Sequence, residues 1–258
     1  TTEATSFVSN YDGGCYRIGD ISFYTKNGDY VGMFGYVKGN LSNVFLLTQY
    51  DSDHPENSYR VEREERVERN HTLYAGVLAG KNEGSISNCA VAGYYLAQTK
   101  NSDEDGTIYG YENSTLYIGG LVGWNEGSIR NSTADNPKLS LNMFKANCYA
   151  GGFVGYNFGS GSVNNCYALT SIVSDASDGK TVIAGFAAYN SASISSSYCA
   201  SALTAQGTGT KAYAFGSNEG NGITSISYYL SQGSYRFVDK LYSYGRGEMN
   251  GSEGTETN

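Results

Sequence analysis

One motif recurs along most of the chain and limits what the chain can fold into. Its fullest copy is residues 119–131, Gly-Gly-Leu-Val-Gly-Trp-Asn-Glu-Gly-Ser-Ile-Arg-Asn. The copies align on a small residue, and in most copies an asparagine follows two positions later. These anchor residues are Gly35, Gly80, Gly123, Gly155, Ala188 and Gly216. Self-similarity of this kind is the signature of a repeat architecture, in which each unit is one small supersecondary element.

Three further columns appear when the copies are aligned on their anchors. The position two residues after the anchor holds Val37, Asn82, Asn125, Asn157, Asn190 and Asn218. A branched apolar residue follows at Leu41, Ile86, Ile129, Val163, Ile194 and Ile223. A second polar column holds Asn43, Asn88, Asn131, Asn165, Ser196 and Ser225. We expect the five asparagines of the first column to form a structural ladder in tight turns, and the apolar column to line the interior.

The composition favours many short strands rather than helices. The 258 residues include 34 Gly and 24 Tyr but only 2 Pro, and no long apolar helical face is present. Each repeat is too small to bury its own apolar face, so the repeats must stack on one another. We therefore predict an all-β protein, a right-handed parallel β-solenoid (β-helix) of about six coils with variable loop insertions. The expected division is an N-terminal cap strand region at 1–29, the solenoid at 30–230, and a C-terminal strand and polar tail at 231–258.

The five cysteines do not suggest a disulfide framework. Cys89 and Cys166 occupy the same repeat column, two repeats apart, and parallel layers ~4.8 Å apart hold such a pair too far apart for a disulfide. With Cys199 in a neighbouring column, these residues are interpreted as small buried hydrophobic side chains. The state of Cys15 and Cys148 stays open at this point.

The residue directly after each anchor is often aromatic. Stacking would place Trp124, Tyr156 and Tyr189 on successive layers, on the outward side of the turn. Such a strip suits sugar rings or a protein partner. The alternative is an aromatic ladder that only stabilises its own surface or lies beneath the inserted loops.

The segment from Asn101 to Glu112 has the spacing of a twelve-residue calcium loop. Possible oxygen ligands are Asn101, Asp103, Asp105 and Glu112, with Gly106 at the sixth position. Asn replaces the usual first Asp, and strands are expected where that motif needs helices. Calcium is thus a possible ligand, and a solvated acidic turn is the alternative; no other cofactor is expected.

Charge and motifs exclude several functional classes. The net charge of −8 disfavours nucleic acid, and without a run of eighteen apolar residues no membrane insertion is expected. The sequence lacks a zinc-binding His-Glu-x-x-His, a Gly-x-Ser-x-Gly elbow and a phosphate loop. We therefore expect no catalytic residues and no enzymatic activity.

The repeat resembles a known family. Residues 119–131, the Gly-Gly-Phe-Val-Gly-Tyr-Asn at 151–157, the Val-Asn-Asn-Cys-Tyr-Ala at 163–168 and the Val-Gly-Met-Phe-Gly-Tyr-Val at 31–37 resemble GLUG-motif repeats. Such repeats occur in bacterial surface adhesins and in the non-catalytic repeat region of secreted immunoglobulin A metallopeptidases. The resemblance covers roughly residues 30 to 230. It implies a bacterial β-solenoid that is extracellular, either secreted or on the cell surface.

The resemblance and the missing catalytic motifs together favour a non-enzymatic surface module. It would act as an adhesin, or as a spacer that presents loops, and its partner would be a host glycan or surface protein. The alternative is a self-assembling structural subunit of an extracellular filament or surface layer, whose partners are copies of itself. A polysaccharide-active β-helix enzyme is a third hypothesis, disfavoured because no cluster of acids and bases is visible.

Overall fold

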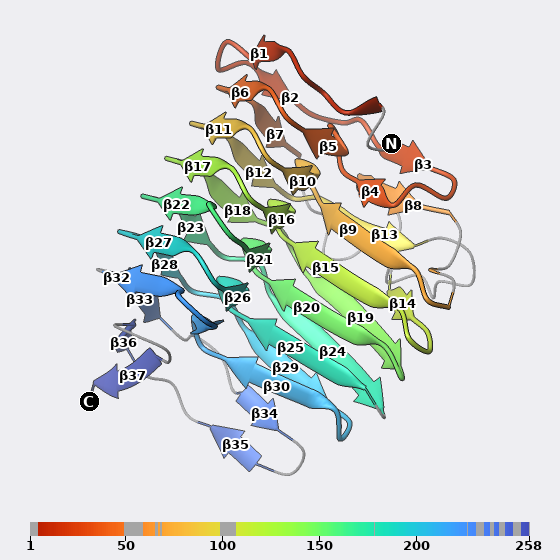
Figure 1. Cartoon of the computed structure of the whole chain (residues 1–258), viewed down its shortest axis with the longest axis vertical. Coiled ribbons are helices and arrows are strands. Elements are labelled where there is room, and N and C mark those ends of the chain that lie inside the picture. Colours follow the sequence, from red (N-terminus) through yellow and green to blue (C-terminus); the bar gives the residue numbers. More distant parts are fainter. Residues whose placement is uncertain are drawn as a thin grey trace.

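The chain folds into a stack of β-strand layers, shown from the side in Figure 1. The computed structural model describes residues 5–48, 59–64, 67, 69–98, 107–177, 179–225, 227–230, 235–237, 240–242, 246–249 and 254–257. Every named regular element within these ranges is a β-strand. The same ranges contain no helix with the length and apolarity needed to cross a membrane.

A single layer of the stack consists of five short strands joined by tight corners. In the layer that holds the fullest copy of the motif these strands are β15 (Thr115–Gly119), β16 (Val122–Asn125), β17 (Ser128–Arg130), β18 (Thr133–Asp135) and β19 (Leu139–Phe144). The next layer begins at β20 (Asn147–Gly151), which pairs in parallel with β15. Because this path repeats, equivalent strands of successive layers form long sheets. The predicted parallel β-solenoid is confirmed.

Six sheets run along the stack, and we name them A to F. Sheet A adds to β16 the strands β5 (Tyr36–Val37), β10 (Ala79–Asn82), β21 (Val154–Asn157), β26 (Ala187–Asn190) and β31 (Gly216–Asn218). Sheet B adds to β17 the strands β1 (Asn10–Asp12), β6 (Asn40–Ser42), β11 (Ser85–Ser87), β22 (Ser162–Asn164), β27 (Ser193–Ser195) and β32 (Ile223–Ser225). Sheet C adds to β18 the strands β2 (Arg17–Ile18), β7 (Phe45–Leu47), β12 (Ala90–Ala92), β23 (Tyr167–Ala168), β28 (Tyr198–Cys199), β33 (Ser227–Leu230), β36 (Arg246–Met249) and β37 (Gly254–Thr257).

The other three sheets hold the remaining strands of the layers. Sheet D holds β3 (Phe23–Thr25), β8 (Arg60–Arg63) and β13 (Tyr95–Gln98). Sheet E adds to β15 and β20 the strands β4 (Tyr30–Val31), β9 (Thr72–Gly76), β25 (Lys180–Ala184) and β30 (Thr210–Tyr213). Sheet F adds to β19 the strands β14 (Ile108–Gly110), β24 (Ile172–Ser177), β29 (Leu203–Gln206), β34 (Tyr235–Phe237) and β35 (Lys240–Tyr242).

The two ends of the stack differ in how their strands pair. At the N-terminal end, β1, β2 and β3 pair in parallel with β6, β7 and β8, so they form a first, partial layer. At the C-terminal end the pairing becomes antiparallel, between β33 and β36, β36 and β37, and β34 and β35. Antiparallel strands at an exposed edge interrupt the parallel register that another layer would need.

Strand register confirms the predicted columns in five copies and corrects the last one. Ile129 pairs with Ile86 on one side and Val163 on the other, and all three are at most 1% exposed. The prediction for Ile223 is wrong, because Ile194 pairs with Thr224. Thr224 is 3% exposed, whereas Ile223 is 63% exposed.

The error at Ile223 comes from the length of one turn. The turn after Asn218 is as long as the one after Asn157, so Ile223 takes the outward position that Ser162 and Ser193 hold. The prediction for Ser225 is wrong for the same reason, since Ser225 pairs with Ser195 rather than following Ser196 in its column.

The interior is one continuous apolar core to which four of the five cysteines belong. Cys89, Cys148, Cys166 and Cys199 are buried free thiols, and Cys15 is an exposed one. Burial raises the pKa of the Cys89 thiol to about 11 and that of the Cys166 thiol to about 12. These side chains therefore pack as small hydrophobic groups, as the repeat columns predict, and Cys148 joins them.

A buried row of asparagine amides runs through the corners between sheets A and B. Its members are Asn82, Asn125, Asn157, Asn190 and Asn218. The Nδ2 of each of the first four donates to the Oδ1 of the asparagine in the next layer, over 2.7 Å from Asn82 to Asn125 and 2.8 Å in the three following bonds. The first four side chains are at most 1% exposed. These hydrogen bonds thus connect successive layers, and water does not compete for them.

A second row of polar residues marks the corner between sheets B and C. Asn43, Asn88, Asn131, Asn165 and Ser196 all have a positive φ, between 50° and 55°. Asn tolerates this left-handed conformation better than most residues, because its short side chain can bond locally. Asn88 donates to Asn43, and Asn43 donates over 2.9 Å to the Asp12 carboxylate.

Removing one amide from the buried row should destabilise the whole stack. Asn125→Ala leaves Asn82 without its 2.7 Å acceptor and Asn157 without its 2.8 Å donor. We expect the free energy of unfolding to fall by about 2 to 4 kcal/mol, the cost of leaving buried polar groups unsatisfied. Urea denaturation followed by circular dichroism measures this loss.

The matched control is Asn164→Ala on the outer face of sheet B. Asn164 is exposed and donates over 2.8 Å to Ser195 in the next layer. A substitution at an exposed strand position should change stability by about 0.5 kcal/mol or less. Equal losses in the two variants would contradict the importance of burial in the asparagine row.

Candidate ligand-binding surface

The structure brings the predicted aromatic strip together on sheet A. Trp124 pairs with Tyr156, and Tyr156 pairs with Tyr189. The ring centroids lie 4.9 Å apart between Trp124 and Tyr156 and 5.8 Å apart between Tyr156 and Tyr189. Towards the N-terminus the column continues with Lys81 and then Tyr36.

A second aromatic column, not predicted from the sequence, lies on the neighbouring sheet E. It consists of Tyr30, Tyr74, Tyr117 and Tyr149, which occupy equivalent positions in successive layers. Their rings are stacked with centroids 5.1, 5.4 and 5.3 Å apart. A signal was present in the sequence, because each of these tyrosines stands two residues before the glycine that ends or follows its strand.

The two columns pack against each other at the corner between sheets E and A. Tyr117 lies edge-on to Trp124 with centroids 4.6 Å apart, and Tyr149 lies 4.9 Å from Tyr189. Phe158, in the turn after sheet A, adds a ring 4.9 Å from Trp124. We call this surface the aromatic face, and it comprises Tyr30, Tyr36, Tyr74, Tyr117, Trp124, Tyr149, Tyr156, Phe158 and Tyr189.

The glycine before Trp124 makes this close packing possible. A Cβ at Gly123 would lie 2.6 Å from both the Tyr117 carbonyl oxygen and the Ala75 backbone nitrogen. Only glycine lets the sheet A backbone approach the sheet E backbone so closely. The anchor of the repeat therefore positions the two aromatic columns against each other.

The aromatic face is accessible at its centre and more buried on sheet A at its ends. Trp124, Tyr156 and the four tyrosines of sheet E are half-buried, and Phe158 is 40% exposed. Tyr36 and Tyr189, by contrast, are only 1% and 7% exposed. The surface that a ligand could contact is thus centred on Trp124.

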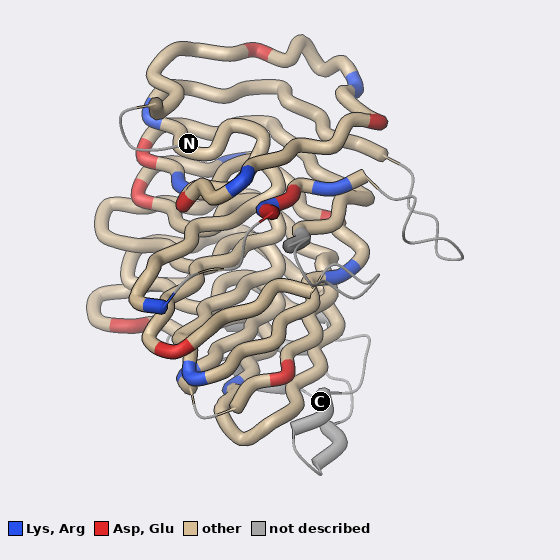
Figure 2. Tube along the Cα trace, turned by 90° about the vertical axis from the view of Figure 1, so that its right-hand side faces the viewer, with Lys and Arg blue, Asp and Glu red and all other residues tan. Residues whose placement is uncertain are grey.

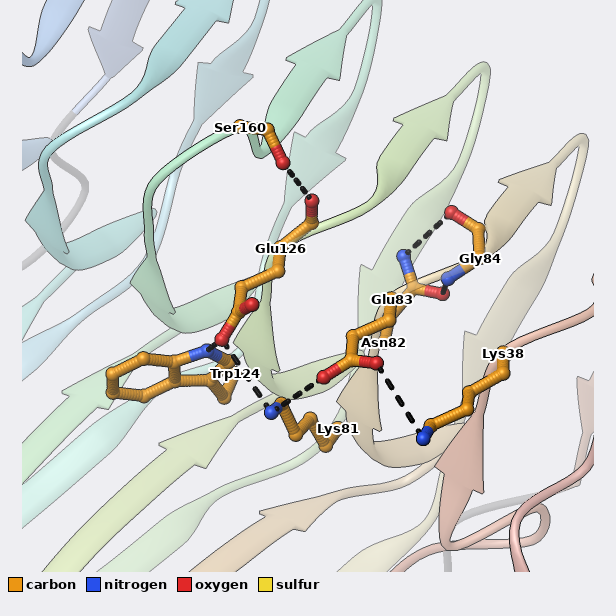
Figure 3. Close-up of polar contacts among 8 residues, drawn as sticks. All are labelled: Lys38, Lys81, Asn82, Glu83, Gly84, Trp124, Glu126 and Ser160. Carbon is orange, nitrogen blue, oxygen red and sulfur yellow. Dashed lines mark hydrogen bonds and ion pairs between the residues drawn. The ribbon is translucent and has the colours of Figure 1, made fainter.

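A chain of charged groups crosses the N-terminal half of the aromatic face (Figure 3). The Trp124 indole N–H donates over 2.7 Å to the Glu126 carboxylate. The Lys81 ammonium lies 3.4 Å from Glu126 and 2.8 Å from Glu83, and Glu83 in turn lies 3.9 Å from Lys38. The Trp124 ring is therefore held in place by a polar network that begins in the neighbouring layers.

These contacts stabilise the charged forms of Lys81 and Glu83. Burial opposes the charge on Lys81, but the Glu83 and Glu126 carboxylates outweigh it and raise the pKa of the ammonium. Burial likewise opposes the charge on Glu83, but hydrogen bonds from Lys81 and Tyr36 lower the pKa of its carboxyl. At neutral pH the network thus holds fixed, mutually compensated charges.

The predicted calcium loop can be followed only in part. Asn101, Asp103 and Asp105 lie outside the described residues. Glu112 follows strand β14 in a turn, and its carboxylate lies 3.6 Å from Arg69. After this turn comes strand β15 (Thr115–Gly119), where the calcium loop motif has a helix, and the calcium site stays a prediction. The described part of the chain contains no cluster of three or more His, Cys, Asp or Glu side chains suited to a metal.

Burial also changes the acidity of the tyrosines. It raises the pKa of Tyr74, Tyr117, Tyr149 and Tyr189 above the ordinary value of 10.0. The folded state therefore holds these phenol protons more tightly than the unfolded chain does. Their contribution to stability is complete below the unfolded pKa and is lost as the pH rises above it.

We expect the melting temperature to be insensitive to these tyrosines up to pH 10.0, their ordinary pKa, and to fall at higher pH. The absorbance of tyrosinate should rise at lower pH in urea-unfolded protein than in native protein. Parallel spectrophotometric titrations of the two states measure the difference. Coincident titration curves, with the native circular dichroism spectrum retained, would contradict the burial of these phenols.

Comparison with known proteins agrees with the repeat pattern. The GLUG motif matches residues 114–140 and 146–173, the layers that begin with β15 and β20. Searches of curated proteins and of solved structures found no significant match. The resemblance is confirmed: the chain carries GLUG-motif repeats, and the two matched copies contain Trp124 and Tyr156.

Proposed function

We propose that the chain is a non-enzymatic extracellular surface module that binds glycans on the aromatic face. The observation that carries this proposal is the half-buried Trp124, fixed by Glu126 among two columns of aromatic rings. Sugars combine apolar C–H faces with hydroxyl groups. They therefore bind where aromatic rings lie beside a few oriented polar groups, here Glu83, Glu126 and Lys81.

The family supports the proposed location. GLUG-motif repeats occur in bacterial surface and secreted proteins. A β-solenoid is also suited to presenting a binding surface at a distance from its attachment, because it extends by adding layers. An adhesin that binds a host glycan combines both properties.

The polar network supports a binding role over a catalytic one. Glycoside hydrolysis needs two carboxyl groups beside the sugar, one of which is a general acid with a raised pKa. Glu83 and Glu126 both approach the Lys81 ammonium, at 2.8 and 3.4 Å, and the pKa of Glu83 is lowered. The Glu83 carboxyl therefore stays ionised at neutral pH and suits hydrogen bonding to hydroxyl groups.

Self-assembly is the second candidate, and the first layer favours it. Val8, Tyr16 and Tyr24 are 69%, 78% and 61% exposed, so three large apolar side chains near this end are accessible. Another copy could bury them by packing against this end. Light scattering across a concentration series tests this candidate, and a monomer at every concentration would exclude it.

Intrinsic fluorescence tests the glycan proposal directly, because Trp124 is the single tryptophan of the chain. We expect an array of defined oligosaccharides to yield ligands that shift or quench this fluorescence. Trp124→Ala should then weaken binding by about tenfold or more in calorimetric titrations, which corresponds to ~1.4 kcal/mol. The loss follows from removing the ring at the centre of the accessible surface.

Tyr198→Ala is the matched control. Tyr198 is 44% exposed and stacks on Tyr167 with centroids 5.2 Å apart, but it lies on sheet C. Removing the Tyr198 ring should leave the affinity for the oligosaccharide unchanged, although it also removes an aromatic stacking contact. An array without any ligand, or an equal loss in both variants, would refute glycan binding at the aromatic face.

A further inference from the structure

The aromatic face is long and narrow. Along the stack it spans five layers, from Tyr30 and Tyr36 through Trp124 to Tyr189. Four layer spacings of ~4.8 Å give it a length of about 19 Å. Across the stack it is only two columns wide, with Phe158 as an added ring. A ligand that uses the whole face must therefore lie along the solenoid axis.

The rings of the two columns are oriented differently. The sheet E tyrosines stack with interplanar angles of 9 to 16°, so their planes lie across the axis and their edges face outward. Trp124 stands at 90° to Tyr74 and 83° to Tyr117, so its plane runs along the axis. The face thus combines one ring suited to stacking with a row of phenol edges, repeated once per layer.

The charges around the face compensate one another. Lys38 and Lys81 pair with Glu83, and the Lys180 ammonium lies 5.2 Å from the Tyr189 ring centroid and 5.7 Å from that of Tyr149. Figure 2 shows acidic and basic residues interspersed on the side that it views, without an extended patch of either sign. The net charge of the chain is −8. A polyanionic ligand would meet lysines that already contact carboxylates or aromatic rings, and it would be repelled by the net charge of the chain.

From these observations we infer that the aromatic face takes a neutral, unbranched glycan lying along the solenoid axis. One sugar ring stacks on Trp124, and its neighbours follow the tyrosine row in both directions. The ligand fits the face because the length of each sugar in an extended β-linked chain is close to the spacing between two layers. This inference rests on the proposed function and adds the class and the orientation of the ligand.

The test is the dependence of affinity on chain length. The probes are β-1,4-linked glucose oligomers and N-acetylglucosamine oligomers of two to eight sugars, with polygalacturonate fragments as the anionic comparison. We expect the affinity for a neutral series to rise by about tenfold or more between two sugars and four, and then to level off, since the accessible rings occupy four layers, from Tyr30 to Tyr149. The anionic fragments should bind more weakly at every length.

Variants at the centre and at one end of the aromatic face make the test specific. Tyr30→Ala, two layers from Trp124, should lower the affinity for the pentasaccharide and leave that for the disaccharide unchanged. Trp124→Ala should lower both, and Tyr198→Ala neither.

Three outcomes would overturn the inference. They are equal affinity for two and five sugars, preference for polygalacturonate, and an identical effect of Tyr30→Ala on short and long oligomers. In each of these cases a glycan still binds, so the proposed function survives. If no glycan binds and the aromatic face instead takes a protein, both proposals fail together.

Discussion

The hydrogen bond from one buried asparagine amide to the next is the interaction on which the rest of the structure depends. Each amide from Asn82 to Asn190 donates to the asparagine of the next layer over 2.7 or 2.8 Å, and Asn218 accepts the last of these bonds. An amide buried without this bond would cost free energy, so a shift of one residue in any layer is penalised. The row therefore fixes the register of sheets A and B, to which the aromatic columns are tied.

Fixed register explains why the candidate site exists at all. Trp124 stands directly before Asn125, so the same register that aligns the amides also aligns Trp124 with Lys81 and Tyr156. Gly123 then lets the sheet A backbone approach Tyr117, whose ring packs 4.6 Å from the indole. The three consecutive residues Gly123, Trp124 and Asn125 thus provide the close approach, the central ring of the aromatic face and the register.

The sequence predicted the columns well because a parallel stack repeats its geometry once per layer. The prediction failed at Ile223, where the length of the repeat changes, because a branched apolar residue does not reveal how long the preceding turn is. It also missed the sheet E column of Tyr74, Tyr117 and Tyr149. Each of these tyrosines stands two residues before a glycine, but that spacing alone does not say which strand lies beside Trp124, and only the fold shows this.

The parts of the site that suggest a function are the ones that break the repeat. Lys81 replaces an aromatic residue in its column, and its ammonium joins Glu83 to Glu126, which holds the Trp124 indole. Phe158 stands directly after Asn157, at the position that Glu83 and Glu126 hold in the two preceding layers, and adds a ring beside Trp124. A ladder serving only stability would gain from uniform stacking. Here the substitutions instead place polar groups around one oriented, half-buried ring, which is the arrangement that a binding surface needs.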